Sequence, residues 1–159
     1  MEETRAKAEF PGWDALADRL VSWAIAEPRV RAVWVEGASA REVRRPYPHL
    51  DAHVAADEPE FDGVFDELRG AVERVLGARL AGIEDVPRFA KELRLEWGDP
   101  PAAASGRVVL ERTSLLAKRP RAHAAILFDR TGHVPHVMDT SLRNRGSPEG
   151  NALTPPPGR

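Results

Sequence analysis

Hydrophobic residues recur at helical spacing in two stretches of the chain. The stronger pattern predicts a helix of about four turns, and its apolar positions are Phe61, Val64, Phe65, Leu68, Val72, Val75 and Leu76. A second stripe, from Trp13 to Ala24, predicts a helix over residues 13–26, and Pro28 is expected to end it. We therefore expect two helices, each with one apolar face.

Short apolar runs and alternation of apolar with polar residues predict several strands. Val33, Trp34 and Val35 are apolar in succession, which is typical of a strand buried on both faces. Further along the chain, apolar and charged residues alternate with the period of two that a half-buried strand produces. Residues 42–49 and the region from Gly82 to Pro87 are expected to form loops. The predicted strands cover residues 31–36, 50–56, 93–97, 107–112, 124–128 and 133–138, the last two joined as a hairpin.

The order of these elements predicts the fold class. A helix, two strands and a second helix precede the remaining strands, so we expect an α/β or α+β protein whose mixed sheet has its helices packed on one side. Residues 1–12 are expected to form a leader and residues 13–140 one domain. Residues 141–159, rich in proline and glycine, are expected to form a disordered tail.

Composition narrows the class of protein further. The chain has 159 residues, 42% of them hydrophobic and 30% charged, which is typical of one soluble globular domain. Neither an export signal nor an apolar run long enough to span a bilayer is found, so a cytoplasmic location is expected. The absence of cysteine excludes disulfides and thiolate metal sites. A net charge of -2 argues against binding to duplex nucleic acid.

Candidate chemistry lies around the first two predicted strands. Small residues from Gly37 to Ala40 would let backbone amides approach an anion closely, and the hydroxyl of Ser39 would add a donor. Asp51 offers a hard oxygen ligand of the kind that magnesium prefers. In an extended segment, Asp51 and His53 point to the same face of the strand.

These residues resemble the nucleotidyltransferase superfamily, in particular its aminoglycoside adenylyltransferases and its minimal, antitoxin-like members. Gly37 matches the family's glycine at a strand end, although Ala38 stands where serine is expected. Arg41 matches an arginine that frequently follows. Asp51 matches the first metal-binding aspartate, and His53 stands where the second should be.

The resemblance implies transfer of a nucleoside monophosphate from a nucleoside triphosphate to a hydroxyl acceptor, with magnesium. Gly37, Ser39 and Arg41 would then hold the triphosphate, and Asp51 would bind the metal ion. Because an imidazole replaces one carboxylate, the resemblance also implies weakened or lost activity, since His53 removes a negative charge and a hard ligand.

Other interpretations remain open at this stage. The chain would alternatively be a non-catalytic interaction or regulatory module of the same fold, a pseudoenzyme with a protein partner. Asp51, His53 and His136 would also suit a zinc, manganese or iron site. His136 lies in the region where some family members carry their third acid, and Asp51 and His53 would otherwise have structural roles. Spacing does not select among four further acids: Glu96, Glu111, Asp129 and Asp139.

Overall fold

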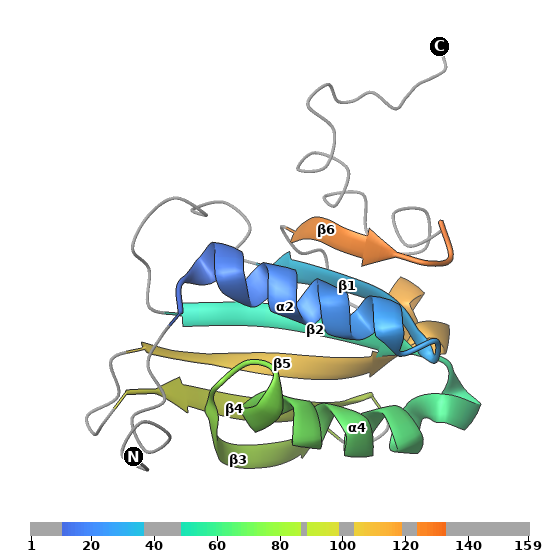
Figure 1. Ribbon diagram of the computed structural model, residues 1–159. Coiled ribbons are helices and arrows are strands. Elements are labelled where there is room, and N and C mark those ends of the chain that lie inside the picture. The colour runs from blue at the N-terminus through green and yellow to red at the C-terminus, as the bar shows by residue number, and fades with distance from the viewer. Residues whose placement is uncertain (1–10, 37–48, 87–88, 99–103, 119–123, 133–159) are drawn as a thin grey trace.

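The computed structural model describes residues 11–36, 49–86, 89–98, 104–118 and 124–132 (Figure 1). Within them, helices and strands follow one another as the hydrophobic pattern predicts, with one additional strand. The elements are α2 (Trp13–Ala26), β1 (Val30–Glu36), β2 (His49–Ala56), η1 (Glu58–Glu60), α4 (Phe61–Arg74), β3 (Arg79–Val86), β4 (Ala90–Trp97), β5 (Ala104–Arg112), η2 (Thr113–Lys118) and β6 (Ala124–Asp129).

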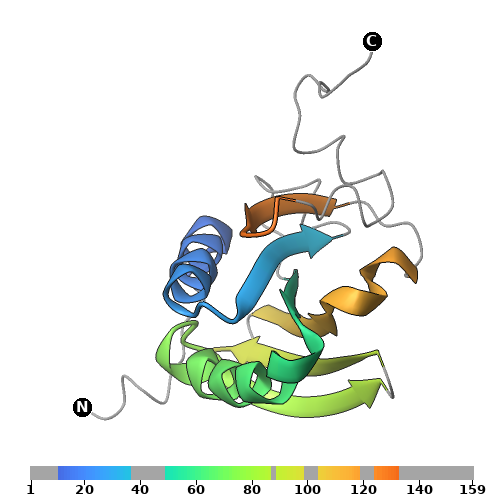
Figure 2. The ribbon, with the colours of Figure 1, turned by 90° about the vertical axis from the view of Figure 1, so that its right-hand side faces the viewer.

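A six-stranded mixed sheet forms the centre of the molecule, in the order β3-β4-β5-β2-β1-β6. The pair β2 and β5 is parallel, whereas every other neighbouring pair is antiparallel. Both α2 and α4 lie on the same side of this sheet, as Figure 2 shows. The predicted fold class, an α/β mixed sheet with helices packed on one side, is therefore confirmed.

The two helices form because their apolar residues fall on one face. The buried residues of α4 are Phe61, Val64, Phe65, Leu68, Ala71 and Val72. On α2, Leu16, Leu20, Trp23 and Ala24 join the same core. Gly77, which adopts a positive φ of 67°, follows α4 and lets the chain turn towards β3. No helix among the described residues is both long enough and apolar enough to cross a bilayer.

Alternation along the strands separates an apolar face of the sheet from a more polar one. On β2, Leu50, Ala52 and Val54 belong to the main core beneath the helices. The residues between them, Asp51 and His53, therefore point to the opposite face. There, Ala32, Trp34, Ala55, Leu116 and Ala124 form a second, smaller core, to which η2 contributes Leu116.

One prediction was wrong, because a strand occupies part of the region expected to be a loop. β3 covers Arg79–Val86 and pairs with β4 at the edge of the sheet. Most of its side chains are exposed, including Leu80, Ile83 and Val86. A strand with no fully buried face produces no clear alternation in the sequence, which explains the error. The predicted strand at 133–138, the leader up to residue 10 and the tail at 141–159 lie outside the described residues.

Candidate functional site

His53 is the centre of a polar cluster on the face of the sheet opposite the helices. The residue lies in the middle of β2 and is only 2% exposed. Three carboxylates surround its ring: Asp51 from β2 itself, Glu36 from β1 and Glu111 from β5. We call these four residues the His53 cluster. It joins three adjacent strands at the centre of the sheet.

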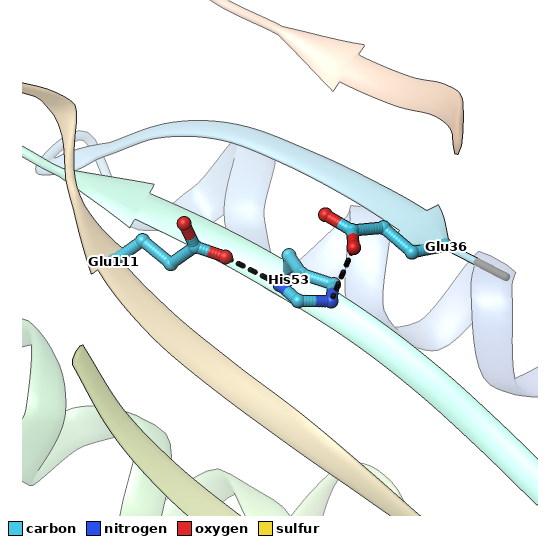
Figure 3. A group of neighbouring side chains, drawn as sticks. All are labelled: Glu36, His53 and Glu111. Carbon is cyan, nitrogen blue, oxygen red and sulfur yellow. Dashed lines mark hydrogen bonds and ion pairs between the residues drawn. The ribbon is translucent and has the colours of Figure 1, made fainter. Parts of the chain in front are cut away.

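Both nitrogen atoms of the ring contact carboxylates. Nδ1 donates to Oε2 of Glu111 at 2.5 Å, and Nε2 donates to Oδ1 of Asp51 at 2.9 Å. Oε1 of Glu36 lies 3.5 Å from the same Nε2. Figure 3 shows Glu36 and Glu111 approaching opposite ends of the ring. Trp34 stacks on the ring, with 5.5 Å between the centroids and 10° between the planes.

Further donors hold two of these carboxylates. Nε1 of Trp34 donates to Oε2 of Glu36 at 2.7 Å. The Arg107 guanidinium donates to both oxygens of Asp51, at 3.0 and 3.5 Å, and also to Glu92 at 3.2 Å. Because each contact starts from a strand of the sheet, the positions of the carboxylates are fixed by the backbone pairing.

The contacts change the protonation of the cluster. Burial alone lowers the pKa of His53, but hydrogen bonds to Asp51 and Glu111 and the negative charge of Glu36 outweigh it and raise the pKa to about 9. Burial alone raises the pKa of Asp51, but His53 and then Arg107 outweigh it and lower the pKa to about 2. At neutral pH the cluster therefore holds an imidazolium cation beside an ionised Asp51.

The structure brings together two of the predicted site residues, Asp51 and His53, in direct contact. Gly37, Ser39, Arg41 and His136 lie outside the described residues, so their predicted roles stay predictions.

Sequence reasoning missed the participation of Glu36 and left Glu111 among several candidate acids. Glu36 closes an apolar strand and immediately precedes the predicted phosphate-binding turn. Two signals were present in the sequence. Glu36 lies two residues after Trp34, so both side chains point to the same face of β1. An acid at the end of a run of buried apolar residues is also unusual enough to mark a site.

The donors in the described part of the cluster do not fit a magnesium ion. Magnesium requires nearly octahedral oxygen ligands at about 2.0–2.1 Å and binds imidazole poorly. Here a ring nitrogen of His53 stands where the resemblance places a second carboxylate. It is also hydrogen-bonded to two acids as a cation.

A cavity of about 370 Å³ lies beside the cluster, over β4 and β5. Arg107 and Glu92 belong to its wall, so the cavity reaches the guanidinium that holds Asp51. Its other lining residues are Ala81, Arg94, Leu95, Glu96, Ser105 and Gly106. Three of its charged lining residues already have partners in the protein: Arg107 donates to Glu92, and Glu96 accepts from Arg79.

The sequence matches no protein-family model, and no curated protein matches it significantly. The functional interpretation therefore depends on the residues themselves and on their geometry.

Proposed function

We propose that this chain is a nucleotidyltransferase-like protein in which transfer of a nucleoside monophosphate from a nucleoside triphosphate to a hydroxyl acceptor is weakened or lost. One observation carries the proposal. Asp51 and His53 lie on one face of β2 and meet an acid, Glu111, from the parallel neighbouring strand β5. In this proposal Glu111 would serve as the third acid that the resemblance expects on a later strand, and the imidazolium of His53 replaces the second carboxylate.

In this proposal, replacement of a carboxylate by His53 would reduce the rate of transfer. A second magnesium-binding carboxylate would supply negative charge, whereas His53 supplies a positive charge at neutral pH. Removing one preorganised stabilising group commonly costs about 10²- to 10³-fold in rate. Placing a cation where the metal would lie costs more, because like charges repel in a site shielded from water.

In this proposal the nucleotide would approach the cluster from the side of residues 37–41, for which the sequence predicts a phosphate-binding turn. Gly37 comes directly after Glu36, the last residue of β1 and a member of the His53 cluster. In this proposal the amides near Gly37, the hydroxyl of Ser39 and the guanidinium of Arg41 hold the triphosphate. The cavity beside Arg107 then offers room for an acceptor.

Calorimetric titrations test this proposal. ATP, GTP, CTP and UTP are each added with magnesium to the wild type, to the single variant Ala38→Ser and to the double variant Ala38→Ser/His53→Asp. We expect the double variant to bind at least one nucleotide about tenfold or more tightly than the wild type, because it regains a second carboxylate. Ala38→Ser alone is the matched control and should change binding less. Equal and negligible binding by all three proteins would refute the proposal.

A second candidate function is a non-catalytic interaction module of the same fold. The exposed apolar residues at the β3 edge favour it, since Leu80, Ile83, Val86 and Phe89 gather on and just after the edge strand. A protein partner would cover them. If the double variant gains no nucleotide binding while Ile83→Lys abolishes binding to a purified partner, the module interpretation is preferred. If Ile83→Lys has no effect on that binding, the β3 edge is not the interaction surface.

A further inference from the structure

We propose that Glu36, Asp51 and His53 form a binding site for a single zinc-like divalent cation. The inference goes beyond the proposed function, because it requires neither a nucleotide nor an acceptor. It also differs from the magnesium site that the resemblance implies, both in its donors and in the residues that supply them. Glu36 belongs to β1 and has no counterpart in the motif on which the resemblance is based.

The choice of ligands follows from the two ends of the His53 ring. Glu36, His53 and Glu111 each offer a ligand atom within 4.8 Å of the others. One metal ion, however, binds one ring nitrogen along its lone pair, and Glu111 contacts Nδ1 whereas Glu36 lies at Nε2. Asp51 also lies at Nε2. The end of the ring that carries two carboxylates is therefore the metal-binding end.

The two distances from Nε2 to the proposed carboxylate ligands are near the separation found in a tetrahedral site. Zinc bonds of about 2.1 Å at tetrahedral angles separate neighbouring ligand atoms by roughly 3.4 Å. Nε2 lies 3.5 Å from Oε1 of Glu36 and 2.9 Å from Oδ1 of Asp51. To admit the ion, the Asp51 carboxylate must move away from Nε2, because Oδ1 now lies at hydrogen-bond distance from it. The fourth position would be taken by water or by a ligand.

Sheet pairing holds the three ligands on a rigid frame. β1 and β2 are antiparallel, and their register pairs Trp34 with His53 and Val35 with Ala52. The same register, continued by one residue, brings Glu36 opposite Asp51. Ligands on adjacent strands are placed more accurately than ligands on loops.

Each proposed ligand is held by a hydrogen bond from or to a neighbouring side chain, as is usual for metal ligands in proteins. Glu111 accepts the Nδ1 hydrogen of His53, so that a ring that has lost its other proton carries its lone pair on Nε2. Trp34 holds Oε2 of Glu36 and leaves Oε1 towards the ring, and Arg107 holds Asp51. Glu111, Trp34 and Arg107 are thus positioning residues.

The donor chemistry selects the class of ion. One imidazole with two carboxylates suits zinc, manganese or iron(II) rather than magnesium. Two carboxylate charges also balance one dication. When the ion binds, the bond between Nε2 and its proton breaks, the proton leaves to solvent, and the freed lone pair forms the bond to the metal.

Zinc titration of chelator-treated wild-type protein, without nucleotide, tests the proposal. We expect one zinc ion per chain, and no displacement by an equal concentration of magnesium. Glu36→Gln and Asp51→Asn should each weaken zinc binding at least about tenfold, and Glu111→Gln about 10- to 100-fold through its effect on ring orientation. Glu96→Gln is the matched control. Glu96 lines the neighbouring cavity and accepts a hydrogen bond from Arg79, away from His53. Zinc binding by this variant should therefore equal that of the wild type.

A second measurement covers the case in which the variants fail to fold. In the wild type, zinc should shift the Nε2 resonance of His53 in nitrogen NMR spectra, while the Nδ1 hydrogen stays in place. Absence of stoichiometric binding would overturn the proposal. The proposal would also be overturned if zinc did not shift the His53 resonance. The same holds if folded Glu36→Gln and Asp51→Asn variants bound zinc as tightly as the wild type. Because no nucleotide is present, failure here is distinguishable from failure of the proposed transferase ancestry.

Discussion

The stability of the metal-free protein should fall as the pH rises from about 6.5 to about 9, because His53 then loses its proton. The pKa of His53 in the folded state, about 9, exceeds its ordinary value of 6.5. Its contribution is therefore complete below pH 6.5 and is lost as the pH rises through 9. At roughly 1.4 kcal/mol for each pKa unit, the loss amounts to about 3 kcal/mol.

Urea denaturation at a series of pH values measures this effect. The wild type is compared with His53→Gln, which keeps a polar side chain but cannot titrate. Ionisable groups outside the His53 cluster titrate alike in both proteins, so the difference between their free energies of unfolding reports on the cluster. We expect this difference to decrease by about 3 kcal/mol across the interval. A difference that stays constant with pH would refute the reasoning, as would an NMR titration of the wild-type His53 ring centred near its ordinary pKa.

Three other substitutions probe the surroundings of the cluster, and a fourth, on the exposed side of α4, serves as a control. Gly106→Ala should destabilise the protein by about 1–3 kcal/mol in urea denaturation, because the added Cβ would lie 2.7–2.8 Å from Leu50 and its backbone. Gly70→Ala, on an exposed part of α4 and near only the flexible end of Arg74, should instead be neutral or stabilising, and equal effects would contradict the account. Trp34→Phe should cost about 1.5–3 kcal/mol, because it removes the hydrogen bond to Glu36, and an unchanged midpoint would disagree. Arg107→Met should raise the pKa of Asp51 from about 2 towards its ordinary value, as measured by NMR of the carboxyl carbon. An unchanged pKa would show that the guanidinium does not influence Asp51.

Local patterns in the sequence were sufficient to predict the helices and the orientation of β2. The spacing of Phe61, Val64 and Leu68 places them on one buried face of α4. Alternation on β2 places Asp51 and His53 together on the other side of the sheet. These features depend on residues that are close in the chain, where periodicity is a direct consequence of backbone geometry.

The rest of the site depends on pairing between distant strands. Glu111 meets His53 across 58 positions of sequence, and the contact exists only because β5 lies beside β2 in one particular register. Sequence spacing alone could not distinguish Glu111 from Glu96 or Asp129. The sequence also could not predict that His53 is buried among acids, because a histidine on a strand is compatible with either a structural or a metal-binding role.

In this account the imidazolium of His53 takes the place of a magnesium ion among the acids of the cluster. The melting temperature of His53→Asp, measured with and without magnesium and compared with that of the wild type, tests it most directly. In the variant, four carboxylates converge, so magnesium should bind the folded state and raise the melting temperature by about 5 °C or more. The wild type should respond by less than about 1 °C, because His53 offers an imidazole nitrogen where magnesium requires a hard oxygen ligand. An equal response of the two proteins, or none in a folded variant, would contradict the account.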